Sequence, residues 1–273
     1  MINIVSENNV RNGELIAKKD IEQLLEQYNT NIYEVIRVIN KKPVFLKEHF
    51  NRMKRSIELS KLNSKLQYVE YKTFIELLIN ENSFENCNIR VSYLKKDDET
   101  YLMYFVKSYY PPEELYEKGI SVVMVTKHRK NPNIKFYESD LREGIDKILS
   151  KKNAFEAILI NDDDTISEGS KSNVFFVKGD TLITSKDSSV LLGVTREKVI
   201  DVCNRNGIKV EKRDIFVREI KLLDGAFITG TSINVLPIKN IDDIVLDSSN
   251  NEIVKKVSDL YLNEVNLNIN QNK

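Results

Sequence analysis

Hydrophobic residues follow two different periods along this chain, and the change from one period to the other predicts a mixture of strands and helices. Alternating or short continuous apolar runs predict strands at residues 32–39, 44–46, 88–94, 101–106, 120–125, 156–160, 172–177, 181–183, 209–212 and 225–229. Apolar residues recurring at steps of three and four predict helices at residues 20–28, 47–62, 68–80, 139–151, 196–206, 217–223 and 251–265. The asparagine-rich end, residues 266–273, is expected to fray.

The predicted helix at residues 47–62 has a polar face beside its apolar one. His49, Arg52 and Ser56 follow one another along this face at spacings of three and four residues. Residues so spaced are neighbours on a helix surface. We therefore expect the three side chains to point into one place.

The distribution of the predicted elements favours an α+β fold of two domains. The pair Pro111-Pro112 stops both helices and central strands, and so marks the best boundary. We predict a small N-terminal α/β domain at residues 1–112, a linker with the strand that follows it at 113–130, and a C-terminal domain at 131–273.

Composition narrows the choice of partners. The 273 residues include 41 Lys and Arg and 41 Asp and Glu, so the net charge gives no reason to expect nucleic acid or an anionic membrane as partner. Cys87 and Cys203 have no metal-ligand spacing, and buried reduced thiols are expected. Since neither a signal peptide nor a membrane-spanning run is recognisable, we expect a cytoplasmic protein.

Two short segments carry the clearest chemistry. Lys135 follows the turn-forming residues Asn131-Pro132-Asn133, and Glu168 stands at a Gly/Ser turn before an apolar run. A lysine can form a Schiff base with an aldehyde cofactor, and a carboxylate commonly partners the pyridinium nitrogen of pyridoxal phosphate. A lysine taken alone is more often a solvated surface charge, so this interpretation depends on the neighbouring motifs.

Small-residue turns provide candidate sites for a phosphate. Gly193-Val194-Thr195 precedes a predicted helix that Thr195 can cap, and the first turn of a helix offers free amides and the positive end of the dipole. Gly230-Thr231-Ser232 adds two hydroxyls after a buried strand, and Arg52 adds a guanidinium suited to bidentate phosphate binding. An ordinary cap, a simple turn and a surface ion pair are the alternatives.

Other kinds of site find little support. Neither His49 nor His128 stands beside a serine or cysteine in a recognised nucleophile motif, and the sequence contains no Walker loop or GxGxxG. The acidic run Asp162-Asp163-Asp164 lacks the glycine and distal glutamate of a calcium-binding loop, so no metal site is predicted.

Taken together and in order, the segments resemble the class IV aminotransferases, the fold-type IV pyridoxal-phosphate enzymes. The resemblance lies in YEVIRV (33–38), HFNRMKRS (49–56), ISEGSKSNVFF (166–176), LLGVTR (191–196), FITGTS (227–232) and VLPI (235–238). It implies a small α/β domain and a larger α/β pseudo-barrel domain, with pyridoxal 5'-phosphate between them. It also implies a homodimer in which the partner completes the substrate pocket.

The same resemblance implies a role for each matching residue. Lys135 would form the Schiff base and carry the proton between the substrate Cα and the cofactor, while Glu168 would keep the pyridine nitrogen protonated. Leu191 would pack on the ring. The phosphate would be bound by Arg52, Val194, Thr195, Thr231 and Ser232.

The substrate side departs from the family patterns. Asp140 stands where the branched-chain enzymes have a tyrosine, with Glu138 and Ser139 beside it. The Arg-x-His pair of D-amino acid aminotransferases and the Arg-Gly pair of aminodeoxychorismate lyases are both absent from the turn at 95–99. Tyr33, Arg37 and Arg90 are candidates for recognising a substrate carboxylate, or are structural.

Three hypotheses follow. The first is a transaminase that moves an amino group between an amino acid, branched-chain or similar, and a 2-oxo acid. The second is a 4-amino-4-deoxychorismate lyase that releases pyruvate with the same cofactor. The third is a non-catalytic paralogue, which the residues at 138–140 keep open.

Overall fold

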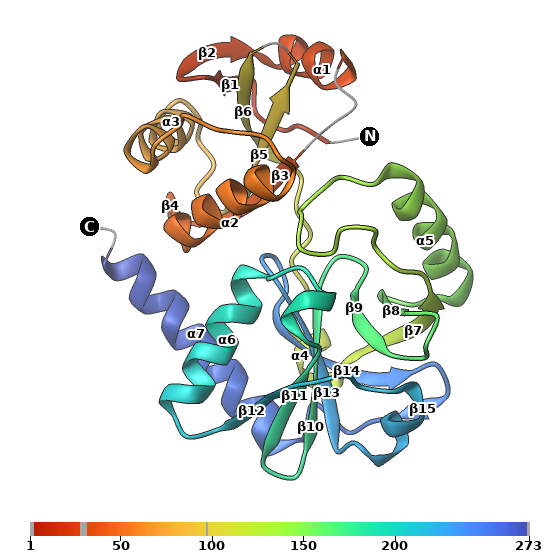
Figure 1. Cartoon of the computed structure of the whole chain (residues 1–273). Helices are drawn as coiled ribbons and strands as arrows, with labels where there is room; N and C mark the ends of the chain where they lie inside the picture. Colours follow the sequence, from red (N-terminus) through yellow and green to blue (C-terminus); the bar gives the residue numbers. More distant parts are fainter. Residues whose placement is uncertain (1–2, 28–31, 97, 272–273) are drawn as a thin grey trace. The chain divides into compact units, whose positions relative to one another are not determined.

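The structure is a computed structural model that describes residues 3–27, 32–96 and 98–271, and the chain forms two compact units (Figure 1). Unit 1 consists of Met1–Tyr109, Ile134–Tyr137 and Leu267–Lys273, and unit 2 consists of Tyr110–Asn133 and Glu138–Asn266. Lys135 therefore belongs to unit 1, although the chain on both sides of its short segment belongs to unit 2. The division into domains at 1–112, 113–130 and 131–273 stays a prediction.

Among the residues that the structure describes, unit 1 combines an antiparallel sheet with three complete helices and the end of the C-terminal helix. Its strands are β1 (Asn8–Arg11), β2 (Glu14–Ala17), β3 (Ile32–Ile39), β4 (Lys42–Pro43), β5 (Cys87–Lys95) and β6 (Glu99–Val106). Its helices are α1 (Lys18–Gln27), α2 (Leu46–Leu59) and α3 (Tyr68–Asn80). The strands pair in the order β2-β1-β6-β5-β3-β4.

The two faces of this sheet differ in character because successive side chains on a strand point to opposite sides. One face, which includes Ile36, Val91 and Met103, packs against the apolar sides of α2 and α3. The opposite face is covered in part by α1, where Ile21 packs near Leu102. The rest of that face carries polar side chains from β3 and β5.

Unit 2 is built on a larger mixed sheet. Its strands are β7 (Ile120–Thr126), β8 (Glu156–Ile160), β9 (Ile166–Gly169), β10 (Asn173–Lys178), β11 (Thr181–Thr184), β12 (Lys209–Lys212), β13 (Gly225–Gly230), β14 (Asn234–Ile241) and β15 (Ile244–Val245). Its helical segments are α4 (Glu113–Lys118), α5 (Ser139–Lys152), the 3₁₀ turns η1 (Asp187–Ser189) and η2 (Val217–Leu222), α6 (Val194–Arg205) and most of α7 (Glu252–Gln271).

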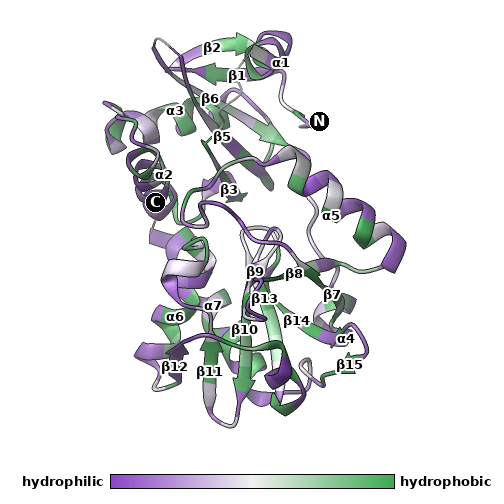
Figure 2. Ribbon diagram, turned by 45° about the vertical axis from the view of Figure 1, so that its right-hand side comes forward, coloured by the Kyte–Doolittle hydropathy of each residue, from purple (hydrophilic) through white to green (hydrophobic). Residues whose placement is uncertain are grey.

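The sheet of unit 2 curls around its own core. The strand order is β12-β11-β10-β13-β14-β7-β8-β9, with β15 on β14, and β9 at one end of this order also contacts β10. The enclosed core joins Val122 and Ile158 to Phe176 and Ile228, and Figure 2 shows hydrophobic colouring along these strands. The predicted mixture of helices and strands is confirmed.

Two of the predicted elements are wrong. Residues 44–46 do not form a return strand, because Phe45 adopts a left-handed conformation (φ 52°) that turns the chain into α2 at Leu46. Residues 266–271 do not fray but continue α7. In this last turn Asn268 Oδ1 accepts a hydrogen bond from Phe45 N (2.9 Å), and Lys42 Nζ donates to the Ile269 carbonyl (3.2 Å).

Other predicted features fall partly outside the described residues or are confirmed. Tyr28, at the end of the first predicted helix, and Asp97, in the turn at 95–99, lie outside the described part of the chain. Cys87 and Cys203 are buried free thiols, as expected. Within the described ranges, no helix is both long and apolar enough to cross a membrane.

Candidate functional site

A buried acid organises the side of β3 that faces α2. Glu34 is fully buried and accepts two hydrogen bonds from Arg52, at 2.8 Å from Nε and 2.6 Å from Nη2. His49 Nδ1 lies 2.8 Å from the same carboxylate. The predicted convergence of the polar face of α2 is thus confirmed for His49 and Arg52, and its centre is an acid that the sequence did not single out.

The ionisation of this cluster follows from its burial and its contacts. Burial alone would raise the pKa of Glu34, but Arg52 and His49 outweigh it and lower this pKa to about 2. Burial lowers the pKa of His49 below its ordinary value of 6.5. Near neutral pH the cluster therefore contains one carboxylate, one guanidinium and a neutral imidazole.

Lys135 is fixed through its main chain. The Tyr33 amide donates to the Lys135 carbonyl (3.1 Å), and the Lys135 amide donates to Ser56 Oγ (3.3 Å). A bridge between Ile32 and Phe136 extends this pairing along β3. Ser56, the third member of the polar face of α2, thus serves the lysine segment rather than Glu34.

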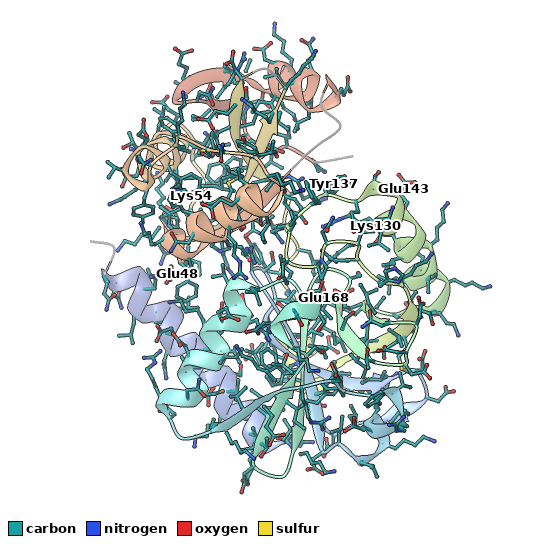
Figure 3. The ribbon with its side chains drawn as sticks, in the orientation of Figure 1. Glu48, Lys54, Lys130, Tyr137, Glu143 and Glu168 are labelled. Atoms are coloured by element: carbon teal, nitrogen blue, oxygen red, sulfur yellow. The ribbon has the colours of Figure 1, made fainter. Side chains whose placement is uncertain are left out.

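The Lys135 side chain joins a cluster of rings and cations. Its Nζ lies 4.8 Å from the centre of the Tyr33 ring, and the Arg90 guanidinium lies 4.0 Å from the same ring. Tyr137, labelled in Figure 3, meets Tyr33 edge to face at 6.2 Å and lies 5.1 Å from Arg90. Two of the five predicted residues of unit 1, Lys135 and Arg90, therefore lie over the ring of a third, Tyr33.

Arg90 itself is 6% exposed, and its Nη2 is a buried donor with no hydrogen-bond partner in the part of the chain that the structure describes. Its Nε lies 3.5 Å from Ser92 Oγ. Arg37 is half-buried and follows Tyr33 on the same face of β3, opposite Asn88 of β5. This face can receive an anion.

Glu168 is the corresponding acid of unit 2, at the end of β9 (Figure 3). Its Oε2 accepts hydrogen bonds from Asn173 Nδ2 (3.1 Å) and from the Leu191 amide (3.0 Å), and its Oε1 lies 3.3 Å from Arg129 Nε. Arg129 also donates to the Ser170 carbonyl (2.7 Å). The carboxylate is thus held from several directions.

Asn173 and Gly193 connect this acid to the start of α6. The Asn173 amide also donates to the Leu191 carbonyl (2.8 Å). A Cβ on Gly193 would lie 2.1 Å from Asn173 Oδ1, so this close approach requires glycine. Gly193 is the N-cap of α6, and the helix begins one residue before the predicted cap Thr195. The capping role predicted for Thr195 is therefore wrong, because the Gly193 carbonyl already accepts the first helical bond from Glu197.

The turn after β13 supplies further hydroxyls in unit 2. Thr231 and Ser232 lie between β13 and β14 and are half-buried. The neighbouring Thr229 is buried, and its Oγ1 has no hydrogen-bond partner among the described residues. A buried hydroxyl of this kind is usually satisfied by a further polar group.

The predicted residues thus form two groups. Unit 1 holds Tyr33, Arg37, Arg52, Arg90 and Lys135, and unit 2 holds Glu168, Leu191, Val194, Thr195, Thr231 and Ser232. Sequence reasoning missed Glu34, Arg129, Tyr137 and the role of Asn173. Of these residues, only Glu34 could have been recognised in the sequence, because it is a charged residue at a position where the alternation of β3 predicts an apolar one.

Comparison with known proteins decides the family. The family model for amino-transferase class IV matches residues 31–241. The chain belongs to this family. The predicted family is thereby confirmed, and with it pyridoxal phosphate as cofactor and transamination as the reaction.

Proteins named as two different kinds of aminotransferase are similar to this chain. It is 26% identical over 271 residues to a D-alanine aminotransferase of Listeria monocytogenes, with 91% of each chain covered. It is 31% identical over 217 residues to a protein of Thermotoga maritima assigned as a branched-chain-amino-acid aminotransferase, with 78% of this chain and 77% of that protein covered. The fold is similar to that of the T.th. branched-chain amino acid aminotransferase solved with pyridoxamine 5'-phosphate (TM-score 0.84, 21% identity, 97% and 96% covered).

The residues present fit the cofactor of the class IV family. Lys135 offers an amine held through its main chain, and Glu168 offers a carboxylate oriented by Asn173 and Leu191. The unpartnered Thr229 hydroxyl, beside the turn at Thr231, adds a donor for a polar ligand.

Proposed function

We propose that this aminotransferase acts on a small amino acid, branched-chain or similar, and a 2-oxo acid, and that Lys135 is the amine that binds the cofactor. The observation that carries this proposal is the position of Lys135. Both polar groups of its main chain are bonded within unit 1, and its amine lies over Tyr33. A lysine held in this way is well suited to repeated proton transfer at one place.

Pyridoxal phosphate supplies a ring that withdraws electrons from the substrate Cα. Lys135 Nζ would move the proton at that carbon. Glu168 would hold a proton at the ring nitrogen, and its orientation by Asn173 and the Leu191 amide supports this role. Leu191 would also pack on the ring.

The phosphate would be bound mainly by groups of unit 2. The free amides in the first turn of α6, at Val194 and Thr195, and the hydroxyls of Thr231 and Ser232 are suited to it. Arg52 would add a guanidinium from α2.

Recognition of the substrate carboxylate would fall to Arg90, assisted by Tyr33 and Arg37. Arg52, Arg129 and Arg196 each contact a carboxylate. No carboxylate of the described residues forms an ion pair with Arg90, although its side chain is buried. A buried guanidinium without a counter-charge is costly, and the carboxylate of an amino acid or a 2-oxo acid would remove that cost.

We also propose a homodimer, as the resemblance to class IV enzymes suggests. Light scattering coupled to size-exclusion chromatography would test it, and a monomer at working concentrations would contradict it. The cytoplasmic location stays a prediction from the sequence.

A visible absorption spectrum tests the role of Lys135. The purified protein with added pyridoxal phosphate should show a band that borohydride bleaches, and Lys135→Ala should lack it. Lys130→Ala, which removes an exposed lysine five residues earlier, is the matched control and should keep the band. A full band in Lys135→Ala would show that another lysine binds the cofactor, and no band in the natural protein would favour a non-catalytic paralogue.

A substrate screen tests the reaction. L- and D-amino acids should be paired with 2-oxoglutarate or pyruvate, beside an assay for pyruvate release from aminodeoxychorismate. We expect amino transfer with at least one pair. Pyruvate release without amino transfer would favour the lyase instead.

A further inference from the structure

The acid–arginine pair between β3 and α2 has a role in the site that the family resemblance did not assign. We propose that Glu34 is a positioning residue, which fixes the guanidinium of Arg52 so that its open edge is presented to the phosphate of the cofactor. The proposal rests on the proposed function, because Arg52 is a phosphate ligand there. Glu34 itself would touch neither cofactor nor substrate.

The place of Glu34 in its strand is the first observation. Ile32, Ile36 and Val38 lie on the same face of β3 and belong to the apolar core under α2. Glu34 stands among them with no exposure to solvent. Burying a carboxylate there is unfavourable unless charged and hydrogen-bonded partners compensate. Packing alone would favour an apolar side chain at this position.

The geometry of the pair is the second observation. A guanidinium has five N–H donors in a planar fork. Glu34 uses the edge formed by Nε and Nη2, at 2.8 and 2.6 Å, which fixes the plane of the fork. Nη1 of Arg52 makes no hydrogen bond with a described residue, and the Arg52 side chain is 10% exposed whereas that of Glu34 is not exposed. The edge that remains open is therefore the one turned away from the acid.

His49 completes the arrangement from the same helix. It lies 2.8 Å from Glu34 Oε2, the oxygen that also accepts from Arg52 Nη2. With a neutral imidazole, Nδ1–H is the donor in this contact. The carboxylate is then held by two side chains one helical turn apart, and it cannot rotate without breaking contacts with both.

Two effects of Glu34 on phosphate binding oppose each other. Its negative charge weakens the attraction of Arg52 for an anion, while its hydrogen bonds keep a flexible arginine in one conformation. The proposal requires that the second effect is larger. The orientation of a bidentate guanidinium is what distinguishes it from a simple point charge.

The test compares two cofactor forms in the full chain. Dissociation constants are measured by visible absorption for pyridoxal phosphate and for pyridoxal, which lacks the phosphate. Each variant is characterised by the ratio of its affinity for pyridoxal phosphate to its affinity for pyridoxal. We expect Glu34→Gln to lower the affinity for pyridoxal phosphate by about tenfold and the affinity for pyridoxal by less than about twofold. Glu34→Asp keeps the charge but withdraws the carboxylate, and it should lower the ratio as well.

Tyr71→Phe is the matched control. Tyr71 is a fully buried residue of α3 whose hydroxyl has no hydrogen-bond partner among the described residues. Removing this hydroxyl breaks none of the hydrogen bonds of the fork, although the hydroxyl lies close enough to interact electrostatically with Glu34 and Arg52, so the ratio should change by less than about twofold. In an Arg52→Met background, Glu34→Gln should have no further effect on the ratio.

The possible outcomes separate this inference from the proposed function. If the natural protein binds neither cofactor form, the proposed function fails. If it prefers pyridoxal phosphate and Glu34→Gln keeps or increases that preference, the positioning role is wrong while the function stands. If the Glu34 variants do not fold, Arg52→Lys carries the test, because it keeps the charge without the fork. It should lose the preference, and retention would overturn the proposal.

Discussion

Unit 1 and unit 2 each bury a glutamate next to an arginine: Glu34 with Arg52, and Glu168 with Arg129. In unit 1 the acid occupies one whole edge of the guanidinium and leaves the other open. In unit 2 the Nη2 of the arginine donates to the Ser170 carbonyl, and its Nε lies 3.3 Å from the acid. The first acid orients an arginine, whereas the second acid is oriented by its surroundings.

This difference is consistent with the different roles proposed for the two acids. The hydrogen bonds and charge of Arg52, together with the contact with His49, lower the pKa of Glu34 to about 2, so this acid stays ionised and takes no part in proton transfer. Glu168 is held by an amide side chain and a main-chain amide, which fix its direction. A carboxylate that accepts a hydrogen bond from a protonated ring nitrogen has to be held in a fixed orientation. Charged partners that occupy both of its oxygens would not serve this purpose.

The largest effect is expected from Glu168→Gln. A neutral amide would no longer stabilise a protonated ring nitrogen, and kcat should fall about 100-fold or more, as for the loss of one well-placed electrostatic contact. Steady-state kinetics of amino transfer measure this. Glu156→Gln is the matched control, because Glu156 is also buried but accepts hydrogen bonds from Ser170, Ser172 and the Lys171 amide. It should lower stability more than kcat, and equal losses of kcat in both variants would contradict the role of Glu168.

The second prediction concerns the stability of the protein at acid pH. The pKa of Glu34 is lowered from its ordinary 4.5 to about 2. The stability that this shift provides is fully present above pH 4.5 and is lost as the pH falls toward 2, an effect of about 3 kcal/mol. The lowered pKa of His49 acts in the same direction, because the unfolded chain takes up its proton first as the pH falls through 6.5.

Urea unfolding between pH 7 and pH 2 would reveal these two steps as a falling free energy of unfolding. Glu34→Gln should lose most of the step below pH 4.5 and keep the one near pH 6.5. An unchanged slope below pH 4.5 in this variant would show that Glu34 is not charged in the native state.

The comparison also shows what the sequence could and could not predict. The helical spacing of His49, Arg52 and Ser56 correctly predicted that they share one face of α2. It could not identify Glu34 as the residue that His49 and Arg52 approach, because these contacts join positions 15 and 18 residues apart in different elements. Arg129 was missed because it lies in a loop with no period to mark its direction.

Strand β14 was missed for a related reason. Proline within an apolar run argues against a central strand, yet Pro237 lies in β14 opposite Phe227 of β13, with β7 on the other side of the strand. Local propensity is overridden here by the neighbours that pair with the strand. The family motifs identified the chemistry because several of them occur along the chain in the order typical of the family. They did not identify which residues form hydrogen bonds with one another.

The third prediction tests how closely unit 2 fixes its acid. In Gly193→Ala the new Cβ would meet Asn173 Oδ1 at 2.1 Å, so the amide that bonds Glu168 must move. We expect a loss of about 1–3 kcal/mol in the free energy of unfolding, as for a broken buried hydrogen bond, and a lower kcat. Gly144→Ala is the control, because a Cβ on this glycine of α5 meets nothing within 4 Å. It should leave kcat unchanged and increase stability slightly.

The smallest effect concerns the helix that carries Arg52. Neither α2 nor α6 has a side-chain cap of its own, but in unit 1 the Phe45 amide at the start of α2 donates to Asn268 of α7. Asn268→Ala should therefore cost about 1 kcal/mol in urea unfolding, as the loss of a helix cap does. If the start of α6 binds phosphate, its amides have to stay open. The start of α2 does not, because α2 would contribute through the Arg52 side chain, almost two turns further along the helix. The ratio of pyridoxal phosphate to pyridoxal affinity should thus be unchanged in this variant. A large fall of that ratio would mean that the start of α2, and not only the Glu34–Arg52 pair, determines how the phosphate is bound.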